Sequence, residues 1–177
     1  MPAKDEIILD FDDFSEKNDR LDLLYRLKSK TPNLKVNLFT VLGRCSDEWV
    51  DVMTDVEWID MIPHGWMHNT NYECIDWGEK EANNYLDKID KFNLTKGWKS
   101  PGWQTPPILY KVLHERGYWI ADHGHNHRKW PKGMKAYTLK KGRHHGHIQN
   151  ACGNGLEECF DFYAGLKGDF QFIKNII

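Results

Sequence analysis

Two histidines four positions apart are the residues whose spacing most clearly suits chemistry. His64 and His68 frame the segment HGWMH (residues 64–68), which follows an apolar run. Imidazole is the commonest protein ligand of zinc and similar ions, and in a helical turn this spacing directs both rings to one side. The pair therefore predicts two ligands of a divalent metal, although nine histidines in 177 residues also produce such pairs by chance.

Two adjacent carboxylates near the start of the chain are the best source of a third ligand. Asp12 and Asp13 directly follow the apolar, strand-like run EIILDF (residues 6–11). The alternative interpretation is that they only neutralise or terminate the end of that strand. Either way, the pattern places two carboxylates at the carboxyl end of a buried strand.

Length and composition indicate one domain over residues 1–177 and exclude several partners. The 24 basic and 26 acidic residues give a net charge of -2, so nothing favours nucleic acid. There is neither an apolar run of roughly 18 residues for a membrane span nor a signal-peptide pattern. The four cysteines form no CxxC pair. We therefore expect a soluble cytoplasmic protein with reduced thiols and no membrane partner, whose oligomeric state stays open.

Strand-like and helix-like segments alternate along the whole chain. The predicted strands are residues 6–11, 34–42, 58–62, a strand end at 97–103, 118–121, 134–139, 143–150 and 169–173. The predicted helices are residues 19–30, 46–53, loosely 69–90, 106–117 and 156–166. This alternation favours an α/β fold with a mostly parallel sheet or an incomplete barrel. Parallel strands end at one rim, which gathers the chemically active residues Asp12, Asp13, His64, Lys99, Asp122 and His147.

The order of these motifs resembles the polysaccharide deacetylase family, also called the NodB-homology domain. The resemblance implies a distorted or incomplete (β/α) barrel with a divalent metal and an N-acetylated sugar as substrate. DFDDF (residues 10–14) is similar to the family motif T-F-D-D-G, which implies Asp12 as the catalytic base and Asp13 as a metal ligand. HGWMH resembles H-[ST]-x-x-H, which implies His64 and His68 as the other two ligands.

Three weaker motifs follow in the family's order. KSP (residues 99–101) resembles R-x-P, which places Lys99 in the catalytic group and the N–H of Gly102 in the oxyanion hole. GYWIAD (residues 117–122) implies that Asp122 orients its neighbours. HGH (residues 145–147) is similar to L-x-H and implies His147 as the general acid.

Three residues depart from the family pattern. Phe14 replaces a glycine, which we expect to crowd a turn. Lys99 replaces an arginine and loses the bidentate fork, so we expect Asp12 to be less firmly held. His145 stands where the family has an apolar residue beside the acetate methyl group, which leaves the identity of the acyl group open.

These observations together predict a metal-dependent hydrolase that deacetylates an N-acetylated sugar or a related small amide. Asp13, His64 and His68 would hold one divalent ion with open positions, zinc first, with cobalt, nickel, manganese or iron as alternatives. The other predicted substrate contacts are Trp98 and Trp103, as flat faces for a sugar ring. Two other functions stay open, a catalytically weak glycan-binding protein and a metal-dependent phosphoesterase. A rival metal cluster is His123 and His127 beside Asp122.

Overall fold

The longest strand, β1 (Glu6–Phe14), is the centre of a parallel sheet. The computed structural model describes residues 5–123, 129–138, 142–149 and 153–177. In that part of the chain, β1 pairs in parallel with three strands, β2 (Val36–Thr40), β7 (Arg143–His147) and β8 (Asp169–Phe170), and β3 (Ile59–Pro63) extends the sheet beyond β2. β1, β2 and β3 are almost wholly buried, as expected for parallel strands covered on both faces.

A second parallel sheet continues the curve of the first. It contains β4 (Gly97–Trp98), β5 (Trp119–Ala121) and β6 (Ala136–Tyr137). A single parallel bridge between His64 and Lys99 joins the end of β3 to the end of β4. Among the described residues no strand ladder connects β6 to β7. The predicted α/β fold with parallel strands is therefore confirmed.

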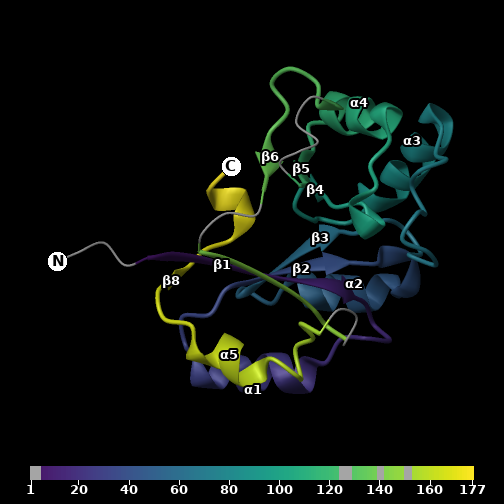
Figure 1. Cartoon of the computed structure of the whole chain (residues 1–177). Helices are drawn as coiled ribbons and strands as arrows, with labels where there is room; N and C mark the ends of the chain where they lie inside the picture. The colour runs from purple at the N-terminus through teal and green to yellow at the C-terminus, as the bar shows by residue number, and fades with distance from the viewer. Residues whose placement is uncertain (1–4, 124–128, 139–141, 150–152) are drawn as a thin grey trace.

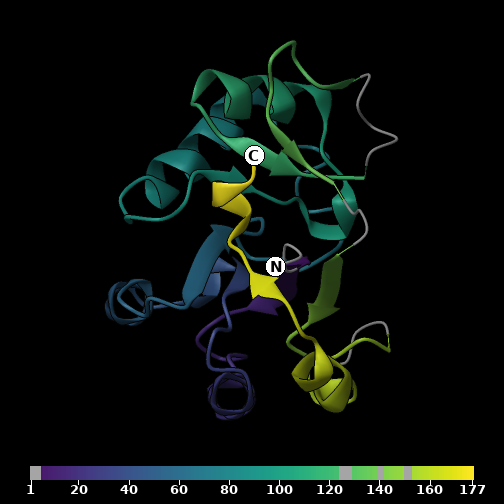
Figure 2. The same cartoon turned by 90° about the vertical axis from the view of Figure 1, so that its left-hand side faces the viewer.

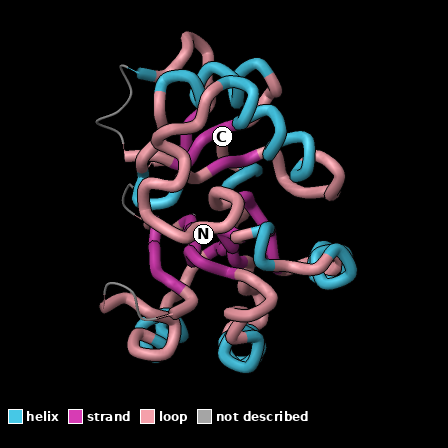
Figure 3. The backbone as a smooth tube through the Cα atoms, turned by 90° about the vertical axis from the view of Figure 1, so that its right-hand side faces the viewer, coloured by secondary structure: helices cyan, strands magenta, loops and turns pink. Residues whose placement is uncertain are grey.

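Helices cover the outside of these strands, which lie within (Figure 3). α1 (Leu21–Lys30) packs against α5 (Phe160–Gly165) on one side of the first sheet, and α2 (Asp47–Thr54) lies beside β3 (Figure 1). α3 (Glu79–Ile89) and α4 (Pro107–Glu115) pack together over the second sheet, at the opposite end of the molecule (Figures 1 and 2). Three short 3₁₀ turns complete the described elements: η1 (Leu42–Arg44), η2 (Pro101–Trp103) and η4 (Ile173–Asn175).

The helix boundaries follow from local sequence. In α2, the Ser46 hydroxyl accepts a hydrogen bond from the Trp49 N–H at 3.3 Å, which is a standard N-cap contact. α4 begins at Pro107, whose missing N–H is harmless in a first turn, and Gly117 follows its end with φ of +77°. α1 buries Leu24 and Leu27 at helical spacing.

Two expectations about elements need correction. The segment 69–90 is helical only from Glu79, because the residues before it form turns that support the HGWMH segment. Phe14 does not crowd a turn, because it lies in β1 and is fully buried, with its ring centroid 5.1 Å from that of Trp49. The left-handed backbone falls one residue earlier, at Asp13, with φ of +66°.

Two further observations concern the described residues as a whole. None of their helices is both long enough and apolar enough to cross a membrane. Their three cysteines, Cys45, Cys74 and Cys159, are free thiols.

Candidate metal and catalytic site

The carboxyl ends of four parallel strands bring the predicted site residues together. Asp12 and Asp13 come from β1, His64 directly follows β3, Lys99 follows β4, and His147 ends β7. Two aspartates and four histidines in this region form two sets of three potential metal-binding groups. We call Asp13, His64 and His68 the ligand group, and Asp12, His145 and His147 the β7 group. Within each set the donor atoms all lie within 4.8 Å of one another.

The ligand group has donor types and a spacing that could hold one metal ion. Asp13 Oδ1 lies 3.2 Å from His68 Nε2 and 3.7 Å from His64 Nε2. Metal bonds of about 2.0–2.2 Å place neighbouring ligand atoms about 3.0–3.5 Å apart, so small shifts allow all three donors to meet one ion. The sequence-predicted ligands are thus brought together, and their donor set fits a divalent metal.

The hydrogen bond of His64 fixes which ring nitrogen faces the site. His64 Nδ1 lies 2.9 Å from the carbonyl oxygen of Lys99, and a carbonyl only accepts, so Nδ1 carries the proton. Nε2 then has its lone pair directed at Asp13. Burial lowers the pKa of His64 to about 4, so the imidazole is neutral at pH 7. Metal ligation requires this neutral form, with the other nitrogen held by an acceptor.

Glu73 braces the segment that carries the histidine ligands. Its carboxylate accepts hydrogen bonds from the backbone N–H groups of Met67 at 2.7 Å, His68 at 2.8 Å and Trp66 at 3.2 Å. Gly65 has φ of +65°, and a Cβ there would lie 2.4 Å from Glu73 Oε2. Sequence reasoning missed Glu73, because a single acidic residue in a polar segment gives no signal of three backbone contacts.

Asp13 is held by its backbone as well as by its side-chain neighbours. Its carbonyl oxygen accepts a hydrogen bond from Asn18 Nδ2 at 2.9 Å. The β1–β2 register shifts between Phe11 and Phe14, which turns Asp13 out of the regular ladder. Aspartate tolerates the left-handed conformation better than most residues, so the backbone strain at Asp13 is modest. This conformation places the Asp13 carboxylate beside His68.

Lys99 is paired with Asp12 in the interior of the site. Its Nζ lies 2.7 and 2.6 Å from the two carboxylate oxygens, and the residue is 0% exposed. The ammonium also lies over the Trp103 ring, 3.8 Å from the centroid, and over Phe39 at 4.8 Å. One ammonium thus contacts both carboxylate oxygens of Asp12 without a guanidinium fork.

This pairing determines the charge state of Asp12. Burial alone raises the pKa of the carboxyl, but the Lys99 ammonium, with contributions from His64 and His145, more than offsets it and holds the pKa well below its usual range. Asp12 is therefore ionised throughout the neutral range.

Two of the three histidines of β7, His145 and His147, direct their Nε2 atoms toward Asp12. Asp12 Oδ2 lies 3.7 Å from His145 Nε2 and 3.9 Å from His147 Nε2. His145 Nδ1 lies 2.6 Å from Asp10 Oδ1, and the other Asp10 oxygen accepts a hydrogen bond from Tyr137 at 2.8 Å. His147 Nδ1 lies 2.8 Å from Asn154 Oδ1. These acceptors place the protons on Nδ1, and neither Asp10 nor Asn154 was predicted as part of the site.

The remaining predicted residues lie around this centre in different roles. Gly102 is exposed in η2, with φ of +57°, and Trp103 is half-buried over Lys99. Asp122 is fully buried and accepts a hydrogen bond from the hydroxyl of Tyr110. The prediction that Trp98 contacts a substrate is wrong, because its side chain is 0% exposed and offers no face to a ligand.

The rival cluster is only partly within the described residues. The ring of His123 lies against Trp103, with the centroids 4.3 Å apart. His127 lies outside the part of the chain that the structure describes.

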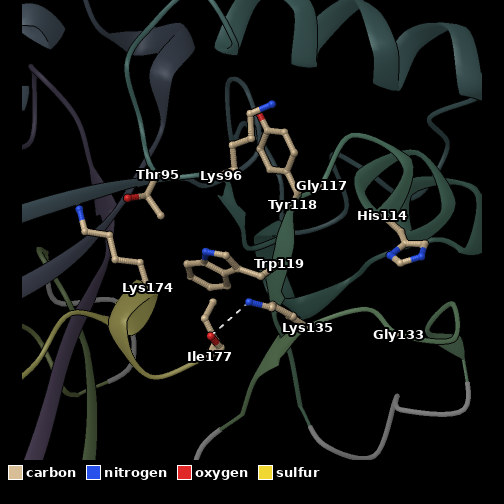
Figure 4. Close-up of a pocket in the computed structure, with 10 residues that line it drawn as sticks. All are labelled: Thr95, Lys96, His114, Gly117, Tyr118, Trp119, Gly133, Lys135, Lys174 and Ile177. Atoms are coloured by element: carbon tan, nitrogen blue, oxygen red, sulfur yellow. Dashed lines mark hydrogen bonds between the residues drawn. The ribbon is translucent and has the colours of Figure 1, made fainter.

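A polar cavity of about 310 Å³ opens beside the ligand group. It is lined by Asp13 and His68 together with amide, hydroxyl and guanidinium side chains: Asn18, Arg44, Asn69, Thr70, Asn71 and Gln149. A different cavity, of about 520 Å³, lies beyond the amino ends of β4 and β5 and is lined by residues such as Lys96, Trp119 and Lys135 (Figure 4). It contains no member of the ligand group or the β7 group.

Comparison with known proteins gives a result for structure and none for sequence. No protein-family model matches the chain, and no curated protein sequence matches it. A family 4 acetyl xylan esterase from Clostridium thermocellum, in complex with a cobalt ion, superposes with a TM-score of 0.65 at 13% identity. The match covers 97% of this chain and 89% of that one. The chain has the polysaccharide deacetylase fold.

Two more structures with the polysaccharide deacetylase fold agree. A family 4 carbohydrate esterase from Streptomyces lividans, in complex with acetate, has a TM-score of 0.60 at 15% identity and covers 90% of this chain and 85% of its own. The catalytic domain of a peptidoglycan N-acetylglucosamine deacetylase from Eubacterium rectale has a TM-score of 0.58 at 15% identity. That match covers 96% of this chain and 89% of the deacetylase domain. The fold expected from the motifs is thus confirmed, at a sequence identity that fits a divergent chain.

Proposed function

We propose that this chain is a metal-dependent hydrolase that removes the acetyl group from an N-acetylated sugar or a related small amide. The observation that carries the proposal is the juxtaposition of the ligand group with the ionised Asp12–Lys99 pair. His64 Nε2 lies 3.7 Å from an oxygen of both Asp12 and Asp13. This arrangement occupies the strand ends of a fold that also serves an acetyl xylan esterase and an N-acetylglucosamine deacetylase.

Asp13, His64 and His68 are the residues that would hold the metal ion. One carboxylate and two imidazoles suit zinc first, and also cobalt, nickel, manganese or iron. When bound, the ion supplies Lewis acidity, which polarises a carbonyl group and acidifies water.

The chain's own residues supply the proton transfers and the orientation. Asp12 accepts a proton from the attacking water, and Lys99 holds its carboxylate in place. The N–H of Gly102 donates to the oxygen that becomes negative as the amide carbonyl is attacked. His147, when both of its ring nitrogens are protonated, delivers the Nε2 proton to the departing amine, while Asn154 accepts a hydrogen bond from Nδ1 and fixes the ring. Asp122 supports the second sheet from behind through Tyr110.

The polar cavity beside the ligand group favours a substrate rich in hydroxyl groups. Its amide, hydroxyl and guanidinium groups can donate to and accept from sugar hydroxyls. Trp103 is the aromatic face closest to the Asp12–Lys99 pair and is our proposed surface for a sugar ring. His145 and Lys99, 3.5 Å apart, make the neighbourhood of the acyl group polar.

A second candidate is a glycan-binding protein with weak catalysis, and one observation favours it. Lys99 holds the pKa of Asp12 low, and a carboxylate that accepts protons poorly is a weak general base. The geometry would then serve to bind a metal and a glycan rather than to turn one over.

Acetate release separates these functions. The metal-loaded protein is incubated with a panel of N-acetylated sugars, nucleotide sugars and amines, and acetate is quantified beside a phosphate-ester panel. We expect acetate release that requires metal and falls about 10²–10⁴-fold in Asp12→Asn. Glycan binding that is equal in both proteins without any release would favour the binding protein. Phosphate release without acetate release would refute the deacetylase proposal.

A further inference from the structure

The β7 group has the same kinds of donor as the ligand group, but its carboxylate is paired with the Lys99 ammonium. Each set holds one carboxylate and two imidazoles whose donor atoms lie within 4.8 Å of one another. In the β7 group, Asp12 Oδ2 lies 3.7 and 3.9 Å from the Nε2 atoms of His145 and His147. Their Nδ1 atoms are held by Asp10 at 2.6 Å and by Asn154 at 2.8 Å.

These second contacts are the kind that prepare histidines as metal ligands. A ligating imidazole usually donates its other N–H to a carboxylate or another acceptor, which fixes the tautomer and the ring orientation. Asp10 is fully buried and is itself held by Tyr137. The β7 group is therefore a built cation cradle with both rings oriented from behind.

The Lys99 ammonium lies beside the donor atoms of the β7 group. Lys99 Nζ lies 2.6 Å from Asp12 Oδ2 and 3.5 Å from His145 Nε2. Of the described residues, only the imidazoles of His64 and His68 form an ion-pair contact with Asp13, so the ligand group has no such competitor. A divalent ion about 2 Å from the β7 donors would lie within about 4 Å of the ammonium, where repulsion in a buried setting is strong.

We propose that Asp12, His145 and His147 form a second divalent-cation site, in which the Lys99 ammonium takes the place of the ion. The wild-type chain then binds one zinc ion tightly, at the ligand group. Replacing Lys99 by an uncharged side chain of similar length frees the donors and opens the second site. This inference concerns metal stoichiometry and does not depend on the proposed deacetylation.

Zinc content after desalting tests the proposal. Wild type is compared with Lys99→Met, Lys99→Met/His145→Ala and Lys99→Met/His147→Ala, and Lys96→Met serves as a matched control at an exposed lysine. We expect one equivalent in wild type and Lys96→Met, two in Lys99→Met, and one in both double variants. A folded Lys99→Met with one equivalent overturns the proposal, as does a second equivalent that survives loss of either histidine.

Two further measurements keep the test decisive. Lys99→Met leaves the Asp12 carboxylate buried without a cation, so this variant is also refolded with zinc and followed by circular dichroism. Zinc-dependent folding that requires His145 supports the second site, and failure to fold in excess zinc overturns it. His64→Ala/His68→Ala/Lys99→Met should retain one equivalent, at the β7 group. If His64→Ala/His68→Ala alone retains its metal, the proposed function loses its ligand group while the second site is still tested by Lys99→Met.

Discussion

The ligand group and the β7 group each contain one of two adjacent aspartates and two histidines, and they differ in what surrounds these donors. In the ligand group, His64 is held by a backbone carbonyl, and the HGWMH segment is braced by Glu73. In the β7 group, the rings are held by side chains and a lysine ammonium shares the carboxylate. One set can therefore accept a divalent ion directly, whereas the other is already neutralised.

This contrast accounts for the different roles that we propose for two adjacent residues of one strand. The β1 backbone is irregular at Asp13. Asp13 contacts His68 and Asp12 contacts Lys99, while His64 Nε2 lies 3.7 Å from an oxygen of each. The carboxylate beside Lys99 keeps its charge but gives up its lone pairs to hydrogen bonds. On our proposal, the neighbouring cation, more than the donor set, decides whether such a cluster binds a metal or handles protons.

The largest expected effect comes from breaking the ligand group. In His64→Ala/His68→Ala we expect loss of the metal equivalent and a fall in acetate release of roughly 10³-fold or more, because metal ions supply several kcal/mol of transition-state stabilisation. Elemental analysis and the acetate assay measure both. His114→Ala, at the cavity of Figure 4, is the matched control and should keep its metal.

The same experiment decides between the two histidine clusters of the sequence. His123→Ala/His127→Ala should keep the metal, since His123 lies against Trp103 rather than among the ligand group. Metal loss in this variant alone would place the metal at His123 and His127 and would contradict metal binding at the ligand group.

The next effect separates catalysis from metal binding. Asp12→Asn keeps the size of the side chain but removes its charge, so we expect turnover to fall about 10²–10⁴-fold, the usual contribution of a general base. The metal equivalent should remain, because Asp13, not Asp12, belongs to the ligand group. Loss of metal in Asp12→Asn would show that the two groups are not independent.

Sequence reasoning succeeded where a short motif meets a strand end. Asp12 and Asp13 at the end of β1 and His64 after β3 were predictable, because parallel strands bring their carboxyl ends to one rim. Lys99 was predicted on the weaker KSP motif, and its burial against both Asp12 oxygens was not foreseen. Local sequence gave the position of each charge but not its partner.

The missed residues show what sequence pattern lacks. Asp10 contacts His145 across 135 positions of the chain, and no periodicity links two such distant residues. Trp98 misled for the opposite reason: it stands between a glycine and a lysine in the sequence but is buried against Trp77, with ring centroids 5.8 Å apart. Whether a single aromatic ring is buried depends on tertiary packing, which cannot be predicted from its neighbours in the sequence.

A smaller effect tests the proton role of the β7 group. We expect His147→Ala to slow release from N-acetylated amines about 10²-fold, because an amine leaves poorly without a proton. An aryl acetate, whose leaving group needs no proton, should be hydrolysed at nearly the wild-type rate. Equal losses on both substrates would mean that His147 acts in binding or folding rather than as the acid.

Substitution of Glu73, which holds the HGWMH segment in place, should have a smaller effect on metal binding. In Glu73→Gln, one carboxylate oxygen becomes an NH₂ group that faces backbone N–H donors, so the HGWMH segment loosens. We expect zinc affinity to fall about 10–100-fold, as is typical when support behind metal ligands is lost. Competition with a coloured chelator measures it, and the exposed Glu79→Gln is the control.

The smallest effect is on the pH dependence of stability in the metal-free protein. Burial lowers the pKa of His64 to about 4, below the unfolded value of about 6.5, so protons bind preferentially to the unfolded chain between these values. Stability should therefore be full above about pH 6.5 and decline as the pH falls toward 4. Thermal unfolding at pH 4.5–7.5 should show a flatter decline in His64→Gln. An unchanged slope would mean that the buried ligand does not exclude protons, which would remove one of the differences between the two groups.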